Sequence, residues 1–207
     1  MNMKESELLG RQISPFLKRG KVDQAYKKLA PILAERTQFP HLQRIGKTFG
    51  ISPLEEVNPF LEKIAGEKTE GGWVVIGGAL QAQLERDFSG AFKRCRNYII
   101  AADVWYGADI LGERVPGPGL LSWFKESKSH LEAWRQSSNV WVRRSVGVAV
   151  HFWAKRSGGE PATIPQAQFL LALLEPMFTE WEMSAAKGVG WGLKTLGKYY
   201  PYIMIEW

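Results

Sequence analysis

The chain has 207 residues, of which 45% are hydrophobic and 23% are charged, as is usual for a globular protein with a buried core. Its formal net charge of +6 favours an acidic partner, nucleic acid first and an anionic membrane surface second. The one cysteine, Cys95, excludes a disulfide framework and a CxxC metal site, and no apolar run approaches the roughly 20 residues of a membrane span.

Helix signals appear from the N-terminal region onward. The first stretch, "MNMKESELLGRQ", is too polar for a signal peptide, so we expect a cytoplasmic protein. Asp23 is the expected N-cap of the helix "QAYKKLAPILAER", in which Pro31 predicts a kink. Ser52 and Pro53 are the expected N-cap and first residue of the helix "LEEVNPFLEKIAG", which Gly66 should end.

The rest of the chain predicts a series of short helices. The run "WVVIGG" from Trp73 has the length of a strand, but the scarcity of period-2 alternation favours a helix that continues into "ALQAQLER". Pro and Gly mark the two longest predicted loops, at 112–119 and 157–165. The further expected helices cover residues 70–86, 88–102, 104–112, 119–126, 129–137, 139–156, 165–178 and 182–198.

This pattern of elements predicts an all-α fold. Short helices joined by tight turns favour an α-solenoid of stacked antiparallel helical hairpins with one long concave face. A compact irregular bundle is the alternative, because the sequence shows no strict repeat period. Neither predicted loop has the composition of a linker, so we expect residues 1–207 to form a single domain.

Few residues are arranged for catalysis or metal binding. His41, His130 and His151 are scattered without metal-ligand spacing and are interpreted as structural, and neither a metal nor a cofactor is expected. The segment "GLKTLGKY" nearly matches a phosphate-binding loop, but Tyr199 stands where Ser or Thr should hold a metal ion and no strand precedes it. We therefore do not interpret this segment as a phosphate-binding loop.

Basic and aromatic residues share one helix face near the C-terminus. Lys187, Trp191, Lys194 and Lys198 recur at helical spacing and form one stripe. Such a stripe suits a surface that meets phosphates and stacks on a sugar or base. The equally weighted alternative is a half-buried indole whose neighbouring lysines extend to water.

A second helix, "NVWVRRSVGVAVHFWAKR", adds positive charge. Trp141 belongs to its expected core stripe, whereas Arg144 lies off that stripe and is expected to be free to bind a phosphate. Arg143 is a further candidate for DNA binding. Upstream, Trp105 and Asp109 lie one helical turn apart, although a core face rejects the acid and a solvent face gains nothing from the indole.

Three segments in order resemble the DNA alkylation repair family, the AlkD-like HEAT-repeat DNA glycosylases. "DVWYGAD" is similar to the family's W-x-x-x-D helix, "SSNVWVRRSVGVAVHF" to its N-x-W-x-x-R helix, and "AAKGVGWGLKTLGKYYP" to its K-A-I-G-W-x-L-R helix. The likeness covers roughly residues 40 to 205. It implies a solenoid of helical pairs around duplex DNA.

The resemblance also implies an activity, the release of cationic N3- and N7-alkylated purines from duplex DNA by a monofunctional, metal-independent glycosylase. By position it makes Asp109, Trp105 and Trp191 the residues that face the damaged nucleotide, and Arg144 a phosphate ligand. The structural alternatives are that Asp109 forms a salt bridge with Arg144 or Arg114 and that Trp105 is a core indole. We expect a monomer that does not bind membranes. A non-catalytic protein that prefers damaged or branched DNA is the second hypothesis, and a protein-interaction scaffold is the third.

Overall fold

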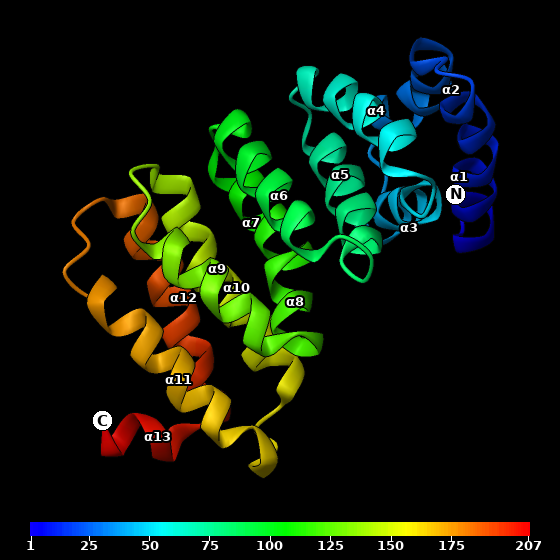
Figure 1. Cartoon of the computed structure of the whole chain (residues 1–207). Coiled ribbons are helices and arrows are strands. Elements are labelled where there is room, and N and C mark those ends of the chain that lie inside the picture. Colours follow the sequence, from blue (N-terminus) through cyan, green and yellow to red (C-terminus); the bar gives the residue numbers. More distant parts are fainter. The chain divides into compact units, whose positions relative to one another are not determined.

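The computed structural model describes all residues, 1–207, and its regular elements are all helical (Figure 1). Helices account for 82% of the chain and there are no strands, which confirms the all-α prediction. None of the helices is long and apolar enough to span a bilayer. The chain divides into two compact units, Met1–Ala102 and Asp103–Trp207. That the whole chain acts as a single domain stays a prediction.

The first unit consists of two layers of helices. In one layer α3 packs between α1 and α5, and in the other α4 contacts α2 and α6 (Figure 1). Stacked helical pairs of this kind are what the succession of short helices predicts. The helices are α1 (Met3–Lys18), α2 (Val22–Ala34), α3 (Phe39–Gly50), α4 (Leu54–Gly66), α5 (Glu70–Gln83) and α6 (Phe88–Ala102).

The segment "WVVIGG" lies inside α5, so its prediction as a helix is confirmed. Its glycines allow close helix packing, because a Cβ on Gly78 would lie 2.4 Å from the Gln43 carbonyl oxygen of α3. Two predicted caps were wrong. Pro53 and not Ser52 precedes α4 at the N-cap, and Asp23 lies within the first turn of α2 because that helix begins at Val22, two residues before the predicted start.

The second unit is built around α10, which packs against α7, α8, α9, α11 and α12. Because neighbours surround it, α10 is buried along most of its length. The elements are α7 (Trp105–Arg114), α8 (Pro116–Ser122), α9 (Phe124–Arg135), α10 (Val140–Ser157), the 3-10 turn η1 (Pro161–Thr163), α11 (Ile164–Leu174), the 3-10 turn η2 (Glu175–Met177), α12 (Met183–Tyr199) and α13 (Pro201–Glu206).

The loop predicted at 112–119 was wrong, because this segment is helical except for a turn at Val115 and is mostly buried. Its glycines make room for α10: a Cβ on Gly112 would lie 3.0 Å from Val148, and one on Gly117 would lie 2.7 Å from the Phe152 ring. Pro116 occupies the first turn of α8, where a missing N–H costs nothing. The expected break between residues 126 and 129 lies instead at Trp123, between α8 and α9.

Candidate functional site

Helix α7 carries an exposed indole and a nearly buried carboxylate on one face. Trp105 is the first residue of α7 and is 56% exposed, although indoles usually lie largely inside a protein. Its only ring contact is an edge-on one with Tyr106. The side chain of Asp109, one turn later, is 13% exposed. The same helix face therefore carries an exposed aromatic ring and, one turn later, a carboxylate that is not fully buried.

Asp109 is held by a bidentate ion pair with Arg144 of α10. The two hydrogen bonds run from Nε to Oδ1 at 2.7 Å and from Nη2 to Oδ2 at 2.8 Å. Paired bonds of this kind fix the plane of a carboxylate. They use one acceptor site on each oxygen, and an ionised carboxylate has about four. The remaining acceptor sites are available to a group outside the chain.

The expectation that Arg144 is free to bind a phosphate was wrong. Its residue is only 8% exposed, and its Nη1 donates to the Ser184 carbonyl oxygen at 2.9 Å in addition to the pair with Asp109. Arg144 lies off the stripe that we assigned as core, but α7 and α12 cover that side of α10. Arg144 thus links α7 to the start of α12.

Arg143, the other candidate from α10, is also taken up inside the chain. Its Nε donates to Glu180 at 2.6 Å, its Nη1 donates to the Ser137 carbonyl oxygen at 2.8 Å, and it pairs with Glu182. The hydrogen bond to Glu180 raises the pKa of Arg143. Arg143 therefore anchors the segment before α12 and is not a free cation.

The backbones of α10 and α12 approach each other closely. A Cβ on Gly147 would lie 2.1 Å from the Gly188 carbonyl oxygen, and one on Gly188 would lie 2.4 Å from the Arg144 carbonyl oxygen. Only glycine fits at such a crossing. This contact brings side chains of α10 within reach of side chains of α12.

Trp191 of α12 is half-buried and stacks on His151 of α10. The ring centroids are 4.1 Å apart with an interplanar angle of 26°. His151 Nδ1 lies 2.7 Å from Thr195 Oγ1. Burial lowers the pKa of His151, and the charge of Lys155 lowers it further, whereas Asp109 opposes the shift. The two indoles, Trp105 and Trp191, have different ring partners and do not stack on each other.

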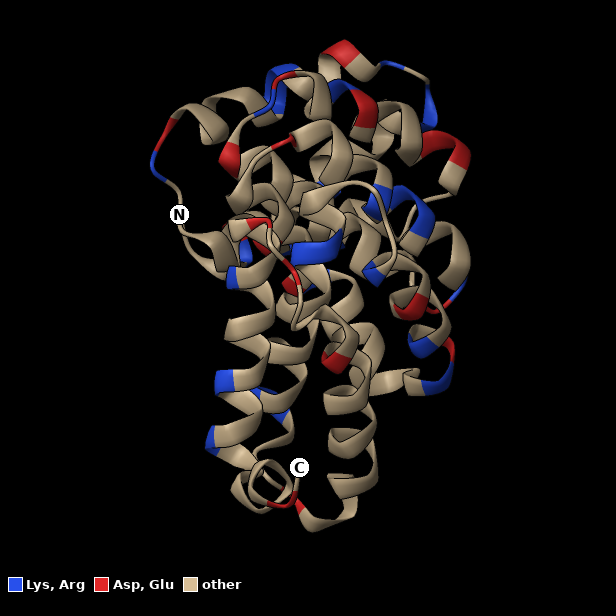
Figure 2. Cartoon of the chain, turned by 90° about the vertical axis from the view of Figure 1, so that its left-hand side faces the viewer, with Lys and Arg blue, Asp and Glu red and all other residues tan.

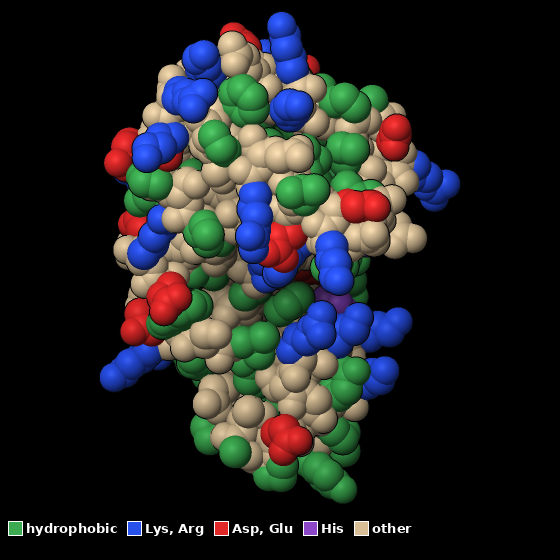
Figure 3. Space-filling view, turned by 90° about the vertical axis from the view of Figure 1, so that its right-hand side faces the viewer, with side chains coloured by type: hydrophobic (Ala, Val, Ile, Leu, Met, Phe, Trp, Pro, Cys, Tyr) green, Lys and Arg blue, Asp and Glu red, His purple; other side chains and the backbone are tan.

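The remaining members of the predicted stripe are exposed. Lys187, Lys194 and Lys198 all point to solvent from α12. Basic residues recur along the helix that leads into the C-terminal segment (Figure 2). On the face shown in Figure 3, lysine and arginine side chains gather beside a surface histidine. The stripe therefore combines a half-buried indole with three solvated ammonium groups.

Sequence reasoning missed two residues of this region. His151 was interpreted as structural because it lacks a metal-ligand spacing; its place four residues before Lys155 was readable from the sequence, but its stack on Trp191 was not. Glu113 lies one turn after Asp109. Burial raises the pKa of Glu113; Arg114 opposes this and Asp109 adds to it.

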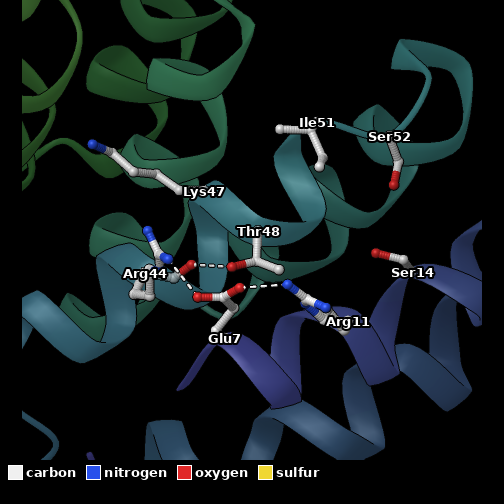
Figure 4. Close-up of a pocket in the computed structure, with 8 residues that line it drawn as sticks. All are labelled: Glu7, Arg11, Ser14, Arg44, Lys47, Thr48, Ile51 and Ser52. Atoms are coloured by element: carbon white, nitrogen blue, oxygen red, sulfur yellow. Dashed lines mark hydrogen bonds and ion pairs between the residues drawn. The ribbon is translucent and has the colours of Figure 1, made fainter. Parts of the chain in front are cut away.

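A separate basic groove lies in the first unit, between α1 and α3. It has a volume of about 530 Å³ and is lined by residues that include Arg11, Arg44 and Lys47. Glu7 bridges the two arginines, with a distance of 2.7 Å from its Oε1 to Arg11 Nη2 (Figure 4). Hydrogen bonds from Arg44 and Arg11 lower the pKa of Glu7. The groove thus has more positive than negative groups.

No group of three or more His, Cys, Asp and Glu side chains is placed to hold a metal ion. In a comparison with protein families, the sequence model described as DNA alkylation repair enzyme matches residues 38–207. No curated protein and no solved structure gives a significant match. The matched region includes α7, α10 and α12, and it leaves out α1 of the basic groove.

Proposed function

The chain belongs to the DNA alkylation repair enzyme family, and from this we propose that it is a DNA glycosylase that releases cationic N3- and N7-alkylated purines from duplex DNA. The observation that carries the proposal is the oriented carboxylate of Asp109 one helical turn after the exposed indole of Trp105. A structural ion pair alone does not require an exposed indole one turn away.

The chemistry of this lesion suits a site with a carboxylate and indoles. In the reaction the C1′–N bond breaks, the bonding electrons leave with the alkylated base, and the base departs neutral. Positive charge develops on the deoxyribose, as in other glycosyl transfers. Water then adds to C1′ and its proton passes to solvent. The base needs no protonation, so no general acid is required.

Asp109 stabilises the developing cation and orients the attacking water in this proposal. A fixed charge aimed at the reacting centre lowers a barrier without reorganisation. Arg144 holds the carboxylate plane, so we assign it a positioning role in place of a phosphate contact. Trp105 and Trp191 present aromatic faces to the sugar, because aromatic faces attract cations.

DNA binding is assigned to the exposed cations. Lys187, Lys194 and Lys198 bind backbone phosphates beside Trp191, since ammonium groups replace condensed counterions on DNA. The groove with Arg11 and Arg44 adds a phosphate contact in the first unit. Glu7 occupies Nη2 of each arginine and leaves their other N–H groups for an anion (Figure 4).

A non-catalytic DNA-binding protein is the second candidate. The observation that favours it is the same ion pair, because Arg144 partly neutralises the charge that Asp109 would present to a cationic sugar. One experiment separates the two candidates. The protein is incubated with a duplex that contains a single N7-methylguanine, and free base and abasic sites are measured against a protein-free control. Binding without release of base would support the second candidate.

A further inference from the structure

The contacts of Thr195 favour one tautomer of His151. Thr195 has one hydroxyl hydrogen, and its Oγ1 lies 2.9 Å from the Trp191 carbonyl oxygen, which can only accept. When the hydroxyl donates there, it accepts from His151, so we assign the ring hydrogen to Nδ1, which lies 2.7 Å from Oγ1. In the neutral ring Nε2 then has a lone pair. Nε2 has no partner within the chain and is not sealed from solvent.

This arrangement lets the ring change its charge without moving. Nδ1 donates to Thr195 in both the neutral and the protonated ring, so the stack on Trp191 survives protonation at Nε2. Three elements surround the ring. Helix α10 places the ammonium group of Lys155 near it, α7 places the Asp109 carboxylate near it, and α12 contributes the uncharged Trp191 and Thr195.

Resting on the glycosylase activity proposed above, we propose that His151 is a positioning residue whose neutral ring keeps the Trp191 indole available to the cationic sugar. An indole attracts a cation through its π electrons. A protonated imidazole on one face of Trp191 competes for those electrons and repels a second cation that approaches the same ring. Excision therefore falls as the pH falls through the pKa of His151.

The lowered pKa of His151 agrees with this role. Burial and Lys155 both favour the neutral ring, so the imidazole of His151 is neutral at physiological pH. Two like charges on opposite faces of one indole repel even at an effective dielectric of about 20, and the expected loss is roughly tenfold. Lys155 thus influences excision indirectly, because its charge lowers the pKa of His151.

The test is the pH profile of single-turnover excision between about pH 5 and pH 7, corrected for spontaneous depurination. We expect the wild-type rate to fall toward low pH with the midpoint of His151 titration measured by NMR. His151→Phe keeps a flat ring against Trp191 and takes up no proton, so its profile, scaled to its own maximum, should lose this fall. His151→Gln serves as the second variant should His151→Phe fold poorly.

A matched pair of lysine and arginine variants tests the electrostatics. Lys155→Gln removes a neighbouring positive charge, raises the pKa of His151 and should move the midpoint to higher pH. Arg156→Gln removes the adjacent charge, which lies over the Phe152 ring, and should leave the midpoint in place. A profile of His151→Phe that keeps the wild-type fall, or a Lys155→Gln midpoint that does not move, would overturn the role of His151 alone. Absence of excision at every pH would overturn the proposed function as well.

Discussion

Asp109 and Arg144 lie 35 residues apart in sequence and share two hydrogen bonds of 2.7 and 2.8 Å between α7 and α10. The side chain of Asp109 is 13% exposed and that of Arg144 is 10% exposed. A largely buried ion pair contributes little net stability over apolar residues, so stability alone does not account for this pair. In the proposed function the pair orients the carboxylate of Asp109 toward the substrate.

Asp109→Asn tests the charge of that group. The variant keeps the shape of the side chain and removes its charge, so excision should fall by on the order of 10²-fold or more. DNA affinity should hardly change, since a carboxylate does not attract phosphates. Single-turnover excision and melting temperature are measured on the same preparation. An unchanged excision rate per folded molecule would show that Asp109 has only a structural role.

Arg144→Lys tests the positioning role. One ammonium group cannot reproduce the planar fork that meets both oxygens of Asp109 and the Ser184 carbonyl oxygen. Excision should fall about 10- to 100-fold because the carboxylate loses its orientation. The dependence of DNA binding on salt should stay as in the wild type. Arg144→Gln removes the charge, and a slope lowered by about 0.9 in that variant would instead indicate the phosphate contact that we first predicted.

Arg144 was first predicted to bind a phosphate and is now assigned a positioning role, and this difference shows what the sequence alone can predict. Helical periodicity and short turns were enough to predict the all-α class, and the spacing of Trp105 and Asp109 was enough to place them on one face. The prediction that Arg144 is exposed failed because it assumed that α10 has one buried face and one solvent face. Helices cover α10 on several sides, so Arg144 is buried although it lies off the predicted stripe.

The loop predicted at Gly112 and Gly117 was a second error of the same kind. Gly112 and Gly117 were interpreted as loop residues, because glycine and proline often mark turns. Their role is to let α10 approach, and this depends on a partner helix that lies more than 30 residues away in sequence. Local sequence signals do not contain that information. The stack of His151 on Trp191 was missed for the same reason.

Trp105→Ala tests the exposed indole. At 56% exposure its removal should leave the melting temperature nearly unchanged, whereas excision should fall about tenfold if the ring stabilises a cationic sugar. Trp181→Ala is the matched control, since that indole is 86% exposed and lies in the turn before α12. Equal effects of the two substitutions on excision would argue against a specific role for Trp105.

The lysines of α12 are tested by the salt dependence of DNA binding. Lys187→Gln, Lys194→Gln and Lys198→Gln should each lower the slope of log K against log salt by about 0.9, the value for one lost phosphate contact. Lys125→Gln removes an exposed charge from α9 and should leave the slope unchanged. Slopes that do not distinguish the α12 lysines from Lys125 would place the DNA on another face.

Gly147→Ala tests the helix crossing on which the site depends. The new Cβ would lie 2.1 Å from the Gly188 carbonyl oxygen and 2.6 Å from the Val189 nitrogen, so α10 and α12 must separate. Overpacking of this kind should destabilise the fold by about 3 kcal/mol. The separation also moves Arg144 and His151 away from their partners on α12, so excision per folded molecule should fall as well.

Gly190→Ala is the control on the same helix. A Cβ at Gly190 meets nothing within 4 Å, and alanine in an exposed helix position should stabilise the fold by about 0.5–1 kcal/mol. Chemical denaturation of both variants gives the two free energies of unfolding, and excision is then measured under conditions where each is folded. If the Gly147→Ala variant is as stable as the wild type, α10 and α12 are not in close contact. The Arg144–Ser184 and His151–Trp191 contacts depend on that close contact.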